Sequence, residues 1–225
     1  IIKPLVEMMS ILIMNIYTAI KPFLEQLGYI ASAFILAQGM HYPKSWGMFI
    51  SLTGALQFFG MFLYSGEKHD IDPNGNERTK MSVTCLVFAI EMCLLTQYYN
   101  SSLFGFLTVL LFYGALGFSV MCYGLCWCIG FNSKKTLEQC TSTSMLLIPV
   151  YTYFKLTGVT FLEPYRYGVF ALGLPVYYLG MLIMASRYYY RPNDYFGKQV
   201  LLIMSLLIGM YFGTIFGINS MFNVA

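Results

Sequence analysis

The chain has 225 residues, of which 58% are hydrophobic and 10% are charged, and its net charge is +3. A soluble domain carries about 25% charged residues, whereas several apolar runs here approach the roughly 20 residues that cross a bilayer. An ordinary soluble protein is therefore excluded, and the small, dispersed positive charge gives no indication of nucleic-acid binding. We expect an all-α, polytopic integral membrane bundle embedded in the lipid bilayer.

The N-terminal segment, residues 1–26, places polar residues at steps of about three and four, with apolar residues on the other face. This pattern predicts an amphipathic helix, which Pro22 is expected to kink or to restart. We interpret the helix as lying in the membrane interface or against partner helices. A spanning helix over residues 5–20 is the alternative.

Residues 27–225 are predicted to form a bundle of about seven membrane helices. The predicted spans are Leu27–Tyr42, Trp46–Tyr64, Met81–Tyr99, Leu103–Phe131, Ser144–Leu162, Tyr167–Ser186 and Val200–Phe222. Tyr and Trp residues cluster near their ends, as they do at membrane interfaces. The fourth span is longer than a bilayer requires, so we expect it to be tilted or to project beyond the hydrocarbon.

The basic residues give the orientation. Ten of the 13 Lys and Arg fall on the side of the N-terminus, while Lys44 and Arg166 fall on the other and Lys155 lies inside a span. Because basic loops are retained on one side of the membrane, we predict an N-terminus on the positive-inside face and a C-terminus opposite. The sequence does not identify which cellular membrane holds the chain. The mitochondrial inner membrane is one that fits.

Two charged residues, Glu91 and Lys155, are predicted to lie deep in the membrane at about equal depth. An isolated charge there costs about 3 kcal/mol or more, so we expect these two side chains to form an ion pair or a water-linked pair. Such a pair either fixes the register of two helices or belongs to an ion or proton path.

The last predicted span carries a small residue at every fourth position. These residues are Ser205, Gly209, Gly213 and Gly217. A ridge of this kind, a glycine zipper, lets another helix approach closely. The approaching helix could come from this chain or from another subunit.

The loop before the third span matches the first half of a calcium loop through Asp70, Asp72 and Asn74. The match fails at position twelve, where Met81 replaces the expected Glu, and a polar turn explains the same residues. Calcium is therefore only a weak candidate, and we expect no cofactor.

The six cysteines do not indicate a disulfide framework. Five are predicted to lie inside apolar helices, where a free Cys behaves as a small hydrophobe, and Cys140 is predicted to lie in a loop. The two histidines, His41 and His69, lie in or beside loops, and no hydrolase, zinc-protease or P-loop motif is present. The sequence therefore gives little support to an enzyme.

These observations favour a non-enzymatic, accessory subunit that packs against other subunits of a larger membrane complex. An energy-transducing membrane is one setting that fits such a complex. The small-residue ridge and the amphipathic N-terminal helix both fit that role. A small-solute or ion transporter or channel that uses Glu91 and Lys155 is the alternative.

Overall fold

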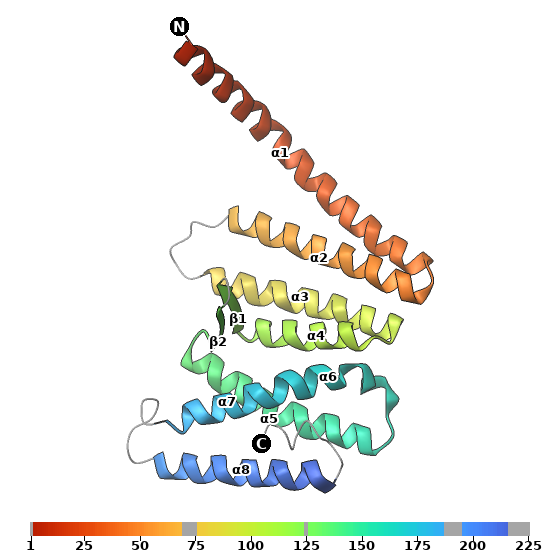
Figure 1. The fold of residues 1–225 in the computed structure, drawn as a ribbon, viewed down its shortest axis with the longest axis vertical. Coiled ribbons are helices and arrows are strands. Elements are labelled where there is room, and N and C mark those ends of the chain that lie inside the picture. Colours follow the sequence, from red (N-terminus) through yellow and green to blue (C-terminus); the bar gives the residue numbers. More distant parts are fainter. Residues whose placement is uncertain (1, 69–75, 124–125, 187–194, 216–225) are drawn as a thin grey trace. The chain divides into compact units, whose positions relative to one another are not determined.

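The computed structural model describes residues 2–68, 76–123, 126–186 and 195–215 (Figure 1). The chain divides into two compact units, Ile1–Asn74 and Gly75–Ala225. The described residues are predominantly helical, as predicted, with one two-stranded hairpin in the second unit. The proposed calcium-loop residues Asp70, Asp72 and Asn74 lie outside the described residues.

The first unit is an antiparallel pair of helices, α1 (Ile2–His41) and α2 (Lys44–Lys68). The predicted amphipathic helix and the first predicted span are joined in α1, which passes through Pro22 without a break. Proline is tolerated inside membrane helices because neighbouring groups satisfy the freed backbone atoms. The division of the chain after residue 26 stays a prediction. It rests on the expectation that residues 1–26 lie in the membrane interface or against partner helices.

Small residues bring α1 and α2 into close contact. Gly39, Gly47, Ser51 and Gly54 are all buried in this interface. A Cβ atom built on Gly54 would lie 2.6 Å from the Leu36 backbone nitrogen. The Ser51 hydroxyl donates a hydrogen bond to the Leu36 carbonyl at 3.2 Å. The helices can therefore approach this closely only because side chains are missing or short at the crossing.

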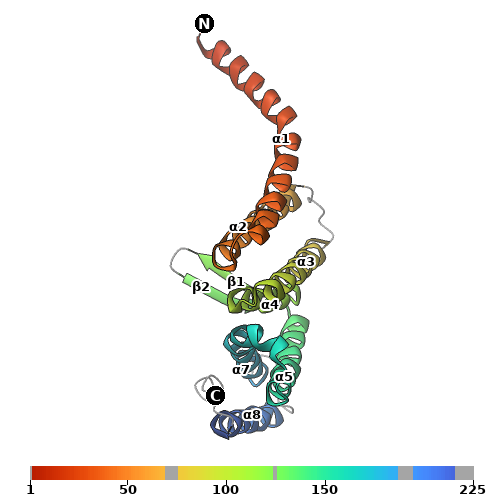
Figure 2. The ribbon, with the colours of Figure 1, turned by 90° about the vertical axis from the view of Figure 1, so that its right-hand side faces the viewer.

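The second unit contains most of the elements. These are α3 (Asn76–Tyr99), α4 (Ser102–Ala115), β1 (Phe118–Tyr123), β2 (Cys126–Phe131), α5 (Lys134–Leu156), η1 (Thr160–Tyr165), α6 (Arg166–Gly168), η2 (Val169–Gly173), α7 (Leu174–Met184) and α8 (Tyr195–Ile215). Helix α3 packs along α4, and α5 packs along α7, as Figures 1 and 2 show. The segment η2 is a π-helical turn directly before Pro175, where the missing N–H disturbs the regular helix.

Fewer of the described helices than predicted are long and apolar enough to span a membrane. Among the described residues, three helical segments are long and apolar enough to cross a bilayer, rather than about seven. They are Lys44–Leu63, Met81–Tyr99 and Thr160–Met184. Ser102–Ala115 and Phe196–Tyr211 are apolar but shorter, and α5 begins with a polar stretch that lowers its hydropathy.

The prediction of one long helix over Leu103–Phe131 is wrong. Helix α4 ends at Ala115, and β1 and β2 form an antiparallel hairpin in which Phe118 is opposite Phe131 (Figure 2). Gly117 has φ +93°, a conformation that glycine adopts easily and that stops the helix. The aromatic and β-branched residues that follow favour strands, and Cys122, Cys126 and Cys128 lie on these strands instead of in a helix.

A buried hydrogen bond joins α4 to α5 in the core of the second unit. Tyr113 and Ser144 are fully buried, and their hydroxyl oxygens lie 2.6 Å apart. Because the Ser144 hydroxyl donates to the Cys140 carbonyl at 2.9 Å, the Tyr113 hydroxyl is the donor in their shared bond. The Tyr113 ring also packs edge-on against Phe118 at a centroid distance of 6.1 Å.

We expect Ser144→Ala to destabilise the protein more than Tyr113→Phe does. Removing the Ser144 hydroxyl leaves the buried Tyr113 hydroxyl without its acceptor, which costs about 2 kcal/mol, whereas Tyr113→Phe leaves Ser144 bonded to its own helix and costs about 1 kcal/mol. Free energies of unfolding measured in detergent micelles check this order. Equal losses for the two variants would contradict the assignment of Tyr113 as the donor.

Cys140 lies in α5 and is fully buried, so its predicted placement in a loop is wrong. Burial raises the pKa of its thiol from 9.0 to about 11. At pH 8 the thiolate fraction is then about 100-fold smaller than that of an ordinary thiol. We expect maleimide labelling of the Cys140 peptide at pH 7, followed by mass spectrometry, to be at least about 100-fold slower in the folded protein than in the unfolded protein. Similar labelling rates in the two states would contradict the burial of this thiol.

Candidate functional site

The structure places Glu91 in the middle of the candidate span Met81–Tyr99, where its side chain is half-buried. Cys93 lies two residues further on, about 200° around the helix. Cys93 lines a cavity that also includes Leu147 and Tyr151 of α5. Glu91 therefore lies on the far side of α3 from the cavity that α5 lines.

Lys155 lies in the last turn of α5, outside the three candidate spans. Within the described part of the chain, no ion pair joins Lys155 to Glu91, while Arg166 forms one with Glu163. The pairing of Glu91 with Lys155 stays a prediction.

The small-residue ridge begins on α8 and faces α7 of the same chain at its start. The Tyr178 hydroxyl donates a hydrogen bond to the Ser205 carbonyl at 3.3 Å. Gly209 lines a groove together with α5 and α7, and Gly213 is buried. Gly217 lies outside the described residues. The first part of the ridge therefore has its neighbour within this chain.

A hydrogen-bonded cluster of Cys93, Gln97 and Tyr165 joins α3 to η1, and we refer to it as the α3–η1 cluster. Gln97 Nε2 donates to the Tyr165 hydroxyl at 3.0 Å, and that hydroxyl lies 3.1 Å from Cys93 Sγ. Beside Gln97, the hydroxyl oxygens of Thr96 and Thr108 lie 3.3 Å apart and join α3 to α4. These groups satisfy one another inside an apolar environment, so they fix the packing of three segments.

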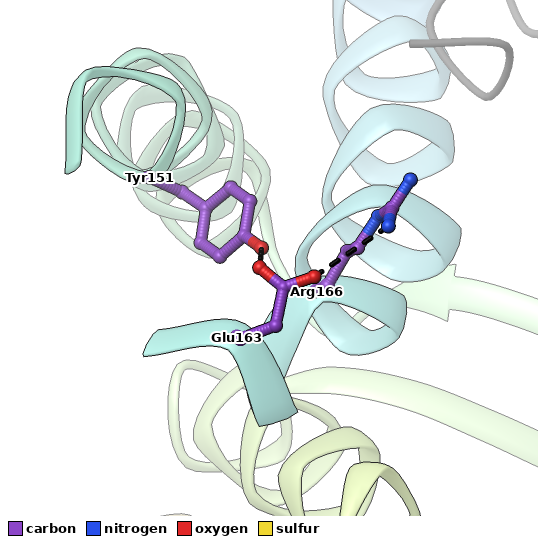
Figure 3. Close-up of polar contacts among 3 residues, drawn as sticks. All are labelled: Tyr151, Glu163 and Arg166. Atoms are coloured by element: carbon purple, nitrogen blue, oxygen red, sulfur yellow. Dashed lines mark hydrogen bonds and ion pairs between the residues drawn. The ribbon is translucent and has the colours of Figure 1, made fainter. Parts of the chain in front are cut away.

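Next to this cluster, Glu163 is held between two side chains (Figure 3). The Tyr151 hydroxyl donates to Glu163 Oε2 at 3.3 Å, and Arg166 Nη1 donates to Glu163 Oε1 at 3.5 Å. The Glu163 and Arg166 side chains are about half exposed, so their attraction contributes at most about 1 kcal/mol. The contact fixes the end of α5 against η1.

The second unit also contains two apolar spaces. One, of about 380 Å³, is lined by α3, α4, α5 and η1 and includes Cys93, Tyr151 and Tyr165. The other is a groove of about 500 Å³ between α5, α7 and α8, which we refer to as the α5–α8 groove. Spaces of this size and apolar character bind hydrophobic ligands. In the described part of the chain, no group of three or more His, Cys, Asp or Glu side chains could hold a metal ion.

No protein-family model, curated protein or solved structure matches the chain. Its function is therefore inferred from its own geometry. The positive features of that geometry are apolar grooves, internally satisfied polar contacts and a long exposed helix.

The sequence did not indicate the α3–η1 cluster. Tyr165 was interpreted only as an aromatic residue at the membrane interface, although Cys93 and Gln97 are four residues apart and share one face of α3. Two polar side chains on one face of an apolar span are a signal that could have pointed to a bonded partner. Nothing in the sequence identifies that partner as Tyr165, 68 residues further on.

Proposed function

We propose that this chain is a non-enzymatic, integral membrane subunit with a structural role in a larger membrane complex, such as one of an energy-transducing membrane. The observation that carries the proposal is the length of α1. With 40 residues it extends about 60 Å, twice the hydrocarbon thickness of a bilayer. Its partner α2 has 25 residues.

The N-terminal part of α1 extends beyond α2, as Figure 1 shows for this unit. Where side chains are described, α1 exposes large apolar residues, among them Met14 at 66% and Phe23 at 65%. A helix that is longer than the bilayer and apolar beyond its own partner is suited to pack against another membrane polypeptide. The N-terminal part of the segment predicted to lie at the membrane surface or against partner helices therefore extends beyond α2.

The interior of the second unit supports a structural role. Its buried hydroxyls donate to carbonyls of their own helices, as Thr141 does to Leu137 at 2.7 Å and Thr152 to Ile148 at 2.8 Å. Among the described residues, no buried side-chain nitrogen or oxygen lacks a hydrogen-bond partner. Satisfied polar groups of this kind rigidify a bundle.

The proposal is tested by extracting the full chain from its native membrane in mild detergent and measuring particle size and composition. We expect a homogeneous assembly that contains other polypeptides. Met14→Trp should reduce the co-purified polypeptides about tenfold, which corresponds to about 1.4 kcal/mol of binding free energy. Leu146→Trp is the matched control, because Leu146 of α5 is 69% exposed, and it should leave the assembly unchanged. A particle containing this chain alone would contradict the proposal.

The alternative function is transport of an ion or small solute, and the position of Glu91 favours it. An ionisable residue in the middle of a span is costly and often marks a transport path. The prediction that separates the two functions is Glu91→Gln. Normal assembly together with lost flux in reconstituted vesicles would support transport, whereas failed assembly would support a structural role for this carboxylate.

A further inference from the structure

The α5–α8 groove runs along a continuous face of each long helix that borders it. On α5 it extends from Met145 to Leu156, and on α8 from Leu201 to Gly209. The α5 side is therefore about 16 Å long at 1.5 Å per residue. This is about half of the 30 Å hydrocarbon core, the depth of one leaflet. The α7 wall belongs to the candidate span Thr160–Met184, which places the groove within the bilayer.

The lining of the groove is almost entirely apolar, and its central polar groups are already bonded. Thr152 donates to the Ile148 carbonyl, Tyr178 to the Ser205 carbonyl, and the Ser205 hydroxyl to the Leu202 carbonyl. A polar ligand would have to give up its bonds to water and find few in return. The apolar lining therefore favours a hydrocarbon as the ligand of this groove.

The size of the groove selects a hydrocarbon chain over a helix. The groove holds about 500 Å³. A helix about 10 Å in diameter would fill that volume within about 6 Å of its length. A single acyl chain, in contrast, can lie along the full length of the groove.

A basic residue lies just beyond one end of the groove. Lys198 is three residues before Leu201 and seven before Ser205, so it lies on the same face of α8 as both. It is half-buried. A basic side chain near the membrane surface attracts anionic lipid headgroups. The charge and the apolar groove together match the two parts of an anionic phospholipid.

We propose that the α5–α8 groove binds one acyl chain of an anionic phospholipid, with the lipid phosphate at Lys198. This site is independent of the proposed role in a complex, because it is built entirely from α5, α7 and α8 of one chain. The lipid fills the space that α8 leaves against α5 and thereby stabilises the position of α8.

The test uses the purified full chain in nanodiscs that contain either phosphatidylglycerol or phosphatidylcholine with a photoreactive diazirine in the acyl chain. After illumination, labelled peptides are identified by mass spectrometry. We expect label to concentrate on residues 145–156 and 201–209, with about fivefold more from phosphatidylglycerol. Label spread evenly over all lipid-facing helices would overturn the proposal.

Two matched pairs of variants sharpen the test. Gly209→Phe places a ring in the groove and should reduce labelling there to the level of the surrounding helix surface. Leu207→Phe, on α8 outside the groove lining where Leu207 is 57% exposed, should leave it unchanged. Lys198→Gln should remove the preference for phosphatidylglycerol, whereas Lys155→Gln should retain it.

The outcomes are distinct. Unchanged groove labelling in a folded Gly209→Phe variant would contradict acyl-chain binding, and an unchanged lipid preference in Lys198→Gln would contradict the headgroup assignment. If Gly209→Phe fails to fold, as judged by gel filtration, Leu201→Trp at the end of the groove provides the same test. Because other polypeptides are absent from the purified sample, this result does not depend on whether the chain belongs to a complex.

Discussion

Gly54→Leu should separate α1 from α2 and destabilise the first unit by about 3 kcal/mol. A Cβ atom at this position would lie 2.6 Å from the Leu36 nitrogen and 3.0 Å from the Ser32 carbonyl oxygen. Both neighbours are backbone atoms, so the helices must move apart to accommodate the new side chain. Resistance of residues 2–68 to proteolysis in detergent, followed with rising temperature, measures the loss.

Gly60→Leu is the matched control in the same helix. Nothing lies within 4 Å of a Cβ atom built on Gly60, and leucine has a higher helix propensity than glycine by nearly 1 kcal/mol. This control should therefore be neutral or slightly stabilising. Similar protease resistance in the two variants would mean that the close contact between α1 and α2 does not hold the first unit together.

Gly105→Ala should destabilise the second unit by about 3 kcal/mol, although it adds a single methyl group. The new Cβ atom would overlap the Pro164 carbonyl oxygen and lie 3.1 Å from the Tyr165 Cα atom. Helix α4 would have to move away from η1, which would also displace Tyr165 from Gln97. The free energy of unfolding in detergent micelles measures the effect.

Gly114→Ala supplies the control in the same helix α4. Its Cβ atom would lie 3.4 Å from Cys85 Sγ, an ordinary van der Waals contact. The gain in helix propensity then makes this variant neutral or slightly stabilising. If Gly105→Ala were as stable as Gly114→Ala, the close approach of α4 to η1 would be contradicted.

The long apolar helices could be predicted from the sequence. The predicted span Met81–Tyr99 coincides with a candidate span in the structure, and the predicted Trp46–Tyr64 differs from Lys44–Leu63 by two residues or fewer at each end. Both segments are long apolar runs: Lys44 lies at the end of the first, and Glu91 is the one charged residue inside the second. Hydropathy alone defines such helices, because an apolar helix of this length is stable in a bilayer without specific tertiary contacts.

The hairpin could not be predicted in the same way. Residues 118–131 are as apolar as a membrane helix, and hydropathy does not distinguish a strand from a helix in such a run. The distinguishing signals were local: Gly117, with its positive φ, and the aromatic and β-branched residues that follow. Gly117 ends the helix that the apolar run would otherwise continue.

The candidate site depended on contacts between distant segments. The Cys93 and Gln97 contacts to Tyr165 and the Tyr151 contact to Glu163 all require the turn of η1 to lie against α3 and α5. A periodic pattern places side chains on a face of a helix but does not specify which segment covers that face. The prediction that Glu91 pairs with Lys155 rests on their equal depth in the membrane. Equal depth does not specify toward which neighbour the Glu91 face of α3 is turned.

Helix α1 connects its N-terminal segment to the contact with α2 as one continuous helix that includes Pro22. Its helical residues run from Ile2 to His41, so a displacement applied near the N-terminus is carried along about 60 Å of helix. The contacts at Gly39 and Gly54 then transmit it to α2. A polypeptide bound to the N-terminal part of α1 would thereby set the tilt of this helical pair in the membrane.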